Sequence, residues 1–361
     1  MGKLQEFQMK MSWNEDMFMC TDVPVDIFHY TSPSGFESIL FNNTKQIELW
    51  ASRHDCLNDT SEGTVAQTRY KVVCENMLQD GELDSSTYDL LINVQPPRTT
   101  LMWHRKGADS ILTRPEYTRY VCSFSKNPDS LAMWNYYSKG SKYEGFNLGF
   151  YAQPMLESIE TQLHPFESKV RLYPVVYEQS EQEQLIKDFI RKLIEHYEPG
   201  DEDILRYMAS NQLLQWSLVF KHDFFKHEEE VRLIVDVGIK KFASQDGIPQ
   251  IDVSYRISNG YTIPYIKLQF EKHCLSYATI GPLMCDAVSK ETQLAVICER
   301  LSANNYTAIE QCSRIPVRRK ILCKRFSTKS RICPGTGRFR QGSPWRPKTP
   351  GSLNRYARPP A

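Results

Sequence analysis

Apolar and polar positions along the chain predict short strands and amphipathic helices that follow one another without a regular rhythm. Strands are indicated where β-branched and aromatic residues cluster or alternate with polar ones. The expected strands cover residues 27–30, 47–51, 120–125, 146–151, 170–177, 231–237, 263–270, 276–281 and 307–312. The expected helices cover residues 34–40, 60–92, 129–137, 180–197, 203–219 and 287–302.

Two of these helices begin at a capping box. Ser34 stands three residues before Glu37, and Ser180 stands three residues before Glu183. In a capping box the serine and glutamate side chains satisfy each other's main-chain N–H groups at the helix start. We therefore expect helices to begin at both places.

The order of the elements decides the expected fold class. An even succession of strand and helix would indicate a parallel sheet, and this chain lacks it. We expect an α+β fold, with mixed, mainly antiparallel sheets and flanking helices. Residues 25–320 are expected to form a single domain, after a loosely attached lead-in over residues 1–24 and before a separate tail over residues 321–361.

Charge sets the tail apart from the rest of the chain. Apolar residues make up 41% and charged residues 24% of the whole sequence, values that are ordinary for a globular protein. Residues 321–361, however, contain ten Lys or Arg, no acidic residue and few aliphatic ones. This composition is typical of a disordered segment. The tail is compatible with contact to nucleic acid, with a solvated appendage, or with an end specific to this chain.

The remaining signals indicate a cytoplasmic protein without a bound metal or membrane contact. No window approaches 18 continuous apolar residues, and residues 1–20 lack the apolar run of a signal peptide. The ten cysteines are spread singly, as reduced thiols are. His222 and His227 do not have a zinc-ligand spacing. The phosphate-binding and nucleophile motifs GxxxxGK[ST], GxGxxG and GxSxG are absent.

Eight short segments stand out along roughly 290 residues of the chain. They are His29–Ser32, Leu49–Ser52 with Leu57–Asp59 and Glu62, Val121–Ser125, Met133–Tyr137, Gly145–Phe150, Glu228–Arg232, Ile280–Pro282 and Ser313–Pro316. In order and spacing this series resembles the bacterial family known as domain of unknown function 2971 (DUF2971).

Three of these segments also resemble the signature of ADP-ribosyltransferases, which have an early His, a middle aromatic residue and a late Glu on a strand. The resemblance implies NAD as substrate, because breaking its nicotinamide–ribose bond develops a cationic sugar that a carboxylate stabilises. It implies Glu230 as the catalytic carboxylate, with Glu228 addressing the acceptor. His29 would bind the ribose. The fold implied is the split sheet of these enzymes.

The same resemblance implies further contacts with NAD. Tyr30 accompanies the histidine, and the nicotinamide ring would pack on Trp134 or Tyr137. The middle element Met-Trp-Asn-Tyr-Tyr departs from the Ser-Thr-Ser or single Tyr of the well-known transferases. The segment Asn58-Asp59 would border the site.

Strand geometry suggests how the late acidic segment is arranged. If residues 228–232 are extended, Glu228, Glu230 and Arg232 share one face, because side chains alternate along a strand. Arg232 would then orient a Glu side chain or bind the NAD pyrophosphate.

Each candidate residue also has a structural interpretation. His29 is compatible with a hydrogen-bonded strand histidine, and Trp134 with Tyr137 is compatible with a helix core. The Asn58-Asp59 pair suits a turn that caps a helix. The run Glu228–Glu230 is compatible with a solvated charge cluster.

Three functions are open from the sequence. The first is an NAD-consuming ADP-ribosyltransferase-like enzyme, such as a toxin or phage-defence effector that modifies protein or nucleic acid and is neutralised by a partner. The second is a non-catalytic binding or sensor domain with the same fold. The third is a nucleic-acid-binding protein that acts through its basic tail.

Overall fold

The structure is a computed structural model. It describes residues 2–14, 16–57, 63–96, 117–137, 144–166, 168–238, 251–258, 260–282 and 289–315. The chain divides into two units, Met1–Val317 and Arg318–Ala361. All of the described residues belong to the first unit, so the expected basic tail lies outside them.

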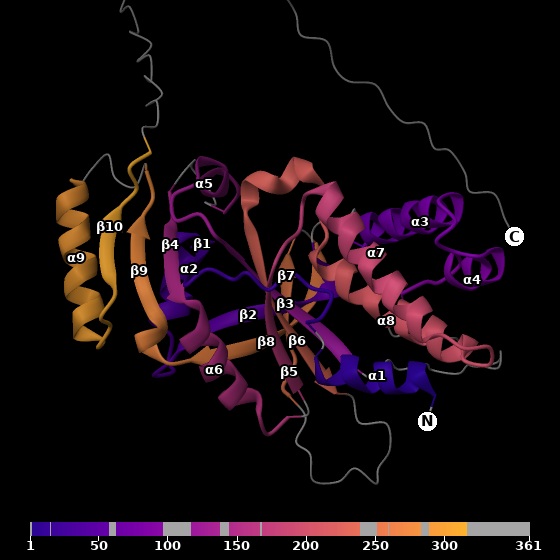
Figure 1. Cartoon of the computed structure of the whole chain (residues 1–361). Helices are drawn as coiled ribbons and strands as arrows, with labels where there is room; N and C mark the ends of the chain where they lie inside the picture. The colour runs from indigo at the N-terminus through magenta and orange to yellow at the C-terminus, as the bar shows by residue number, and fades with distance from the viewer. Residues whose placement is uncertain are drawn as a thin grey trace, which may run out of the picture. The chain divides into compact units, whose positions relative to one another are not determined.

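In the described residues ten strands form one sheet in the order β10-β9-β4-β1-β3-β2-β8-β7 (Figure 1). Outside this path β6 pairs with β3, and β5 pairs with β6. β9 and β10 are parallel, and the other described pairs are antiparallel. The expected α+β class, with a mixed and mainly antiparallel sheet, is confirmed. The strands are β1 (Asp26–Thr31), β2 (Ile47–Arg53), β3 (Tyr117–Ser125), β4 (Phe146–Tyr151), β5 (Ser168–Pro174), β6 (Glu230–Gly238), β7 (Ser254–Ser258), β8 (Tyr261–Phe270), β9 (Leu275–Ile280) and β10 (Ile309–Cys312).

The sheet branches at β3. One edge of β3 pairs with β6 along its whole length. The other edge is shared, because Ser52 of β2 pairs with Val121 and Phe28 of β1 pairs with Ser125. Between these two contacts β1 and β2 separate, and they continue with different neighbours, β4 and β8. Ser123 lies at this split.

Helices cover both faces of the sheet. α1, α3, α4, α7 and α8 gather beside β5 and β6, whereas α9 lies at the other end of the sheet beside β10 (Figure 1). α6 packs against β5 and β8. No helix in the described part of the chain is long and apolar enough to cross a membrane. The helices are α1 (Lys3–Trp13), α2 (Pro33–Leu40), α3 (Thr64–Gln79), α4 (Ser85–Leu91), α5 (Leu131–Tyr137), α6 (Ala152–Leu163), α7 (Gln179–His196), α8 (Glu202–Val219) and α9 (Lys290–Ala303), with the 3₁₀ helices η1 (His54–Cys56), η2 (Asp223–Glu228) and η3 (Lys272–Cys274).

At strand β6 the two faces of the sheet border two separate hydrophobic cores. Val231, Leu233 and Val235 face a core that contains apolar residues of α2, α6 and α9. Ile234 points the other way, into the core of the helices beside β5 and β6. On that second face β6 also carries the charged residues Glu230, Arg232 and Asp236, all of which are buried.

The N-terminal residues differ from the expected loose lead-in. Leu4 and Phe7 of α1 are buried in the core that surrounds α7 and α8. The indole Nε1 of Trp216 donates to the carbonyl oxygen of Phe18 at 3.0 Å. The described residues of this segment, 2–14 and 16–24, are therefore packed against the domain, because their apolar side chains complete this core.

Two expected helices begin or break at different positions. α2 begins at Pro33, and the hydroxyl of Ser32 accepts a hydrogen bond from Gly35 N. A proline at the first helical position favours this earlier start over the capping box at Ser34. The helix expected over residues 60–92 is divided into α3 and α4, because the chain turns at Gly81 with a φ of 74°.

Candidate functional site

The acidic segment is bent rather than extended. Glu228 ends η2, and Glu229 has a left-handed backbone with a φ of 45°, before β6 begins at Glu230. The assumption that residues 228–232 form one extended face is therefore wrong. The bend nevertheless brings both carboxylates to the same cation, as their contacts with Lys221 show.

Lys221 connects the two carboxylates. Its Nζ lies 2.8 Å from Oε2 of Glu228 and 3.0 Å from Oε2 of Glu230. Arg232 adds a two-point contact with Glu230, from Nε at 2.9 Å and from Nη2 at 3.1 Å. Arg232 Nη1 also donates to the carbonyl oxygen of Leu218 at 2.7 Å, which fixes the guanidinium against the end of α8. We call Lys221, Glu228, Glu230 and Arg232 the charge cluster.

Burial differs between the two acids. The side chain of Glu230 is 7% exposed, whereas that of Glu228 is 14% exposed. Burial alone would raise the pKa of Glu230, but the charges of Arg232 and Lys221 outweigh it and hold this pKa at about 2. Glu230 is thus a fixed anion, and Glu228 is the member of the pair that reaches solvent.

The nearby charges also act on Lys221. Burial would lower the pKa of Lys221, but the carboxylates of Glu230 and Glu228 raise it. The ammonium group therefore stays protonated at physiological pH. It also lies 5.1 Å from the ring centre of Phe225, a cation–π distance.

Hydroxyl groups surround the charge cluster. The Ser123 hydroxyl hydrogen-bonds the Glu230 carboxylate, and the Tyr177 hydroxyl accepts the main-chain N–H of Glu230 at 3.0 Å. Partial burial, with the charges of Glu230 and Glu228, raises the pKa of Tyr137 to about 12. Tyr137 comes from α5 and is 43% exposed. It places an accessible ring beside the cluster.

Trp134 of the middle aromatic segment has a structural role. Trp134 is buried and stacks edge-to-face on Tyr30 with ring centres 4.9 Å apart. Its Nε1 donates to Asp129 at 2.8 Å. The Tyr30 hydroxyl donates to the carbonyl oxygen of Asn127 and accepts from Ser130 N, both at 2.8 Å. The pair holds α5 against β1, which agrees with the helix-core interpretation of Trp134.

His29 lies on the other face of the sheet from Glu230. In antiparallel pairs, opposite residues share a face, and Phe28 pairs with Ser125, which in turn pairs with Glu230. His29 follows Phe28 and so points to the other side, where its ring is 5.8 Å from that of Phe124. Its Nδ1 lies 3.2 Å from the carbonyl oxygen of Ser123.

Burial lowers the pKa of His29, and the Ser123 carbonyl only partly opposes this shift. This histidine is therefore neutral at pH 7 and hydrogen-bonded within the sheet. The structure thus separates His29 from the charge cluster, whereas it brings Glu228, Glu230, Arg232 and Tyr137 together.

Two candidate positions cannot be placed. Asn58 and Asp59 lie outside the described residues. Among the residues that are described, no group of three or more His, Cys, Asp or Glu side chains has the arrangement of a metal site.

Lys221, Ser123 and Tyr177 were not among the candidates from sequence. Lys221 is seven residues before Glu228 in an irregular segment, where no periodicity assigns it a face. Ser123 did carry a signal, because it stands within the strand segment Val121–Ser125 that supports the family resemblance.

One family comparison covers the part of the chain that holds the charge cluster. Residues 133–233 match the model of a family described as protein of unknown function (DUF2971). The similarity to this family is limited to that segment. The matched segment extends from α5 to β6, so it includes the entire charge cluster and Tyr137, whereas His29 lies before it. Comparison with curated proteins and with solved structures finds no significant match.

Proposed function

We propose that this protein is an NAD-consuming ADP-ribosyltransferase-like enzyme whose reaction takes place at the charge cluster. The supporting observation is the pair of carboxylates held by one ammonium group, of which Glu228 is the more exposed. Glycosyl transfer needs an anionic oxygen beside the sugar, because positive charge develops at the anomeric carbon.

In this proposal Glu228 takes the role that the resemblance implies for Glu230. Glu230 is bonded on both oxygens and buried, so its charge is directed at Arg232 and Lys221. Glu228 is the carboxylate that meets the ribose. Glu230 is a positioning residue, which acts on Glu228 through Lys221.

The proposed transfer breaks one bond and forms another at ribose C1′. The bond between the nicotinamide nitrogen and C1′ breaks, and nicotinamide leaves with the electron pair. A nucleophile on a protein or nucleic acid then bonds to C1′ and loses its proton to solvent water. The exposed ring of Tyr137 is suited to pack against the planar leaving group.

A non-catalytic binding domain is the second candidate, and the charge balance of the cluster favours it. Two carboxylates and two cations sum to zero, so the cluster has no excess negative charge with which to stabilise an oxocarbenium ion. A site of this kind can bind a polar ligand without turnover.

Release of nicotinamide from NAD by the purified full chain tests the enzyme proposal. Glu228→Gln should slow this release by roughly a hundredfold or more, the usual effect of removing one stabilising group from a transition state. Glu181→Gln on α7 is the matched control and should leave the rate unchanged. Equal rates for wild type and Glu228→Gln would exclude the enzyme proposal and leave the binding domain.

Labelled NAD added to a cell lysate then identifies the acceptor class. Label removed by protease indicates a protein acceptor, and label removed by nuclease indicates a nucleic acid.

A further inference from the structure

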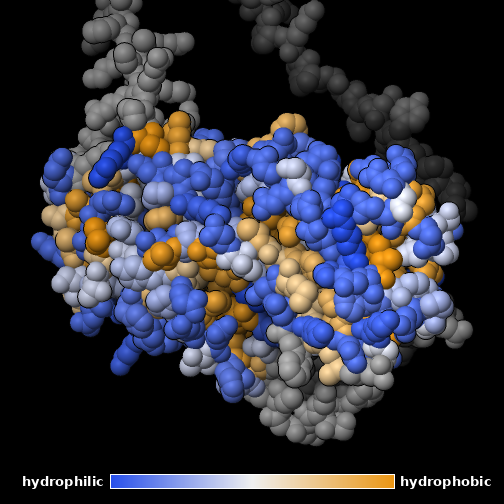
Figure 2. Space-filling model, viewed as in Figure 1, coloured by the Kyte–Doolittle hydropathy of each residue, from blue (hydrophilic) through white to orange (hydrophobic). Residues whose placement is uncertain are grey.

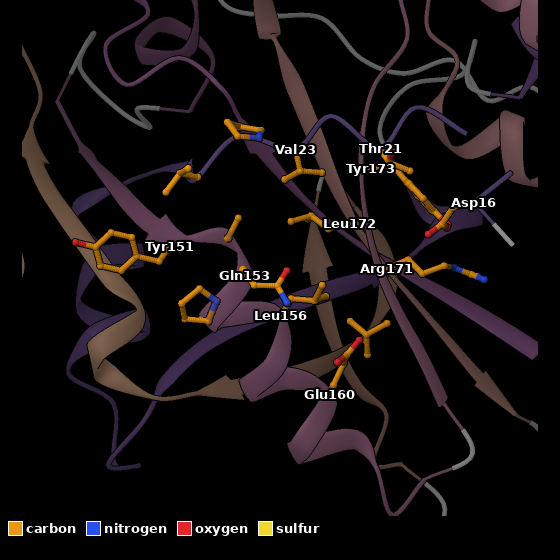
Figure 3. A pocket seen from close by; sticks show the side chains of 15 residues that line it. Asp16, Thr21, Val23, Tyr151, Gln153, Leu156, Glu160, Arg171, Leu172 and Tyr173 are labelled. Carbon is orange, nitrogen blue, oxygen red and sulfur yellow. The ribbon is translucent and has the colours of Figure 1, made fainter. Parts of the chain in front are cut away.

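A groove lies along the free edge of β5, the strand that pairs with β6. It has a volume of about 640 Å³ and is lined by the segment around Thr21 to Val25, by the start of α6 and by the consecutive residues Val170–Tyr173 (Figure 3). Figure 2 shows apolar side chains gathered in a recess over α6 and β5. A volume of this size is in the range of ligand sites.

The main chain of β5 faces this groove. Among the described strands, β5 pairs with β6 alone. Val175 N donates to the carbonyl oxygen of Glu230 at 2.9 Å, and bonded and non-bonded positions alternate along an antiparallel pair. The N–H and C=O groups of Val170 and Leu172 therefore point away from β6.

Pro174 supports this orientation. It occupies the next outward position along β5. Proline lacks an N–H and is tolerated in a sheet where that group would face away from the neighbouring strand. Among the described residues, this edge of β5 is therefore a regular strand edge. The main-chain N–H and C=O groups of Val170 and Leu172 on it are available to pair with another strand.

The side chains on the two sides of this edge differ in character. Val170 and Leu172 point toward Leu156 of α6, which makes one side apolar. On the other side the Tyr173 hydroxyl donates to Asp16 Oδ1 at 2.5 Å, and Figure 3 shows these two side chains together. An incoming strand would place every second side chain on each side.

Charge favours a basic occupant. The lining contributes the carboxylates of Asp16 and Glu160 and one guanidinium, that of Arg171. Arg171 is ion-paired with Asp236, which also pairs with Arg119. Together with Asp16 and Glu160, three carboxylates then stand against two guanidinium groups. The one negative charge that remains favours Lys or Arg in the occupant.

We propose that the groove binds an extended peptide that adds a strand to the free edge of β5, with alternating apolar and basic side chains. Main-chain hydrogen bonds to Val170 and Leu172 supply affinity, and the two sides supply specificity, as in other cases of strand addition. This inference does not depend on the NAD reaction.

Fluorescence anisotropy of a labelled hexapeptide, Lys-Val-Lys-Val-Lys-Val, with the full chain tests the proposal. Two further peptides carry N-methyl groups on the odd or on the even residues. Only one set of amides faces β5, so one methylated peptide should lose at least about tenfold in affinity and the other should bind as the parent does. Equal binding of both would overturn strand addition.

Variants test the occupant's charge. Asp16→Asn combined with Glu160→Gln should weaken binding severalfold, and Glu181→Gln should not change it. Hydrogen exchange at Val170 and Leu172 should slow when the parent peptide is bound. Absence of saturable binding at millimolar peptide, or equal affinity for Glu-Val-Glu-Val-Glu-Val, would overturn the proposal. Nicotinamide release is unaffected by either result.

Discussion

His29 and Glu230 lie on opposite faces of the same sheet, although only β3 separates their strands. One sugar cannot contact both side chains across the sheet. The early histidine and the late acid, which together suggested a transferase, therefore do not form a common site, and the proposed reaction depends on the charge cluster alone.

His29→Gln should alter the pH dependence of stability and leave NAD turnover within about threefold of wild type. The pKa of His29 is lowered in the folded protein, so below pH 6.5 the unfolded chain binds a proton that the folded chain does not. Wild type should therefore lose stability as the pH falls below 6.5, and the variant should lose less. Urea unfolding at pH 7.5, 6.5 and 5.5 measures this. If a folded His29→Gln variant lost NAD turnover, the conclusion that His29 lies outside the reaction site would be wrong.

Glu230→Gln should remove an acid-sensitive contribution to folding. The pKa of Glu230 is about 2, against 4.5 for an ordinary glutamate. The ionised form contributes its full stabilisation above pH 4.5, and this contribution is lost as the pH falls from 4.5 toward 2. The difference amounts to roughly 3 kcal/mol. Unfolding measured across this pH range should show a shallower slope for the variant, and an unchanged slope would contradict the assignment.

Lys221→Met should destabilise the fold by roughly 3 to 5 kcal/mol, because it leaves Glu230 with one buried cation fewer. Glu228→Gln should cost far less, since Glu228 reaches solvent. Denaturant unfolding of both variants at pH 7 compares the two effects. Similar costs would mean that Lys221 does not hold the cluster together.

Tyr137→Leu should raise the KM for NAD by roughly three- to tenfold, the usual worth of one aromatic contact, whereas Tyr137→Phe should leave it unchanged. The pKa of Tyr137 is about 12, so the hydroxyl is protonated at neutral pH and the ring is the part expected to act. A larger effect of Tyr137→Phe on kcat than on KM would instead indicate that the hydroxyl takes part in the reaction.

The α+β class and most strands could be predicted from the sequence, because runs of β-branched and apolar residues such as Val231–Val237 favour buried strands. The sequence predicted only some members of the charge cluster and not their geometry. Glu228, Glu230 and Arg232 were found as a group, but their geometry depends on the left-handed backbone at Glu229. No local pattern distinguished that bend from an extended strand.

Tertiary contacts explain the other differences. α1 is a helix of low amphipathic contrast that is fixed by its place against α7 and α8, as the burial of Leu4 and Phe7 shows. The face on which His29 lies depends on the register between β1 and β3, which is set by a single pair, Phe28 with Ser125. Register between distant segments is a property of the folded sheet.

The branching of the sheet at β3 has a consequence for how the protein opens. β1, β2 and β6 all use β3 as a neighbour, so none of the three can detach fully while β3 keeps its bonds, and β3 cannot leave before all three have parted. Its inner amides should thus be the slowest to exchange with deuterium, opening only when the whole domain unfolds.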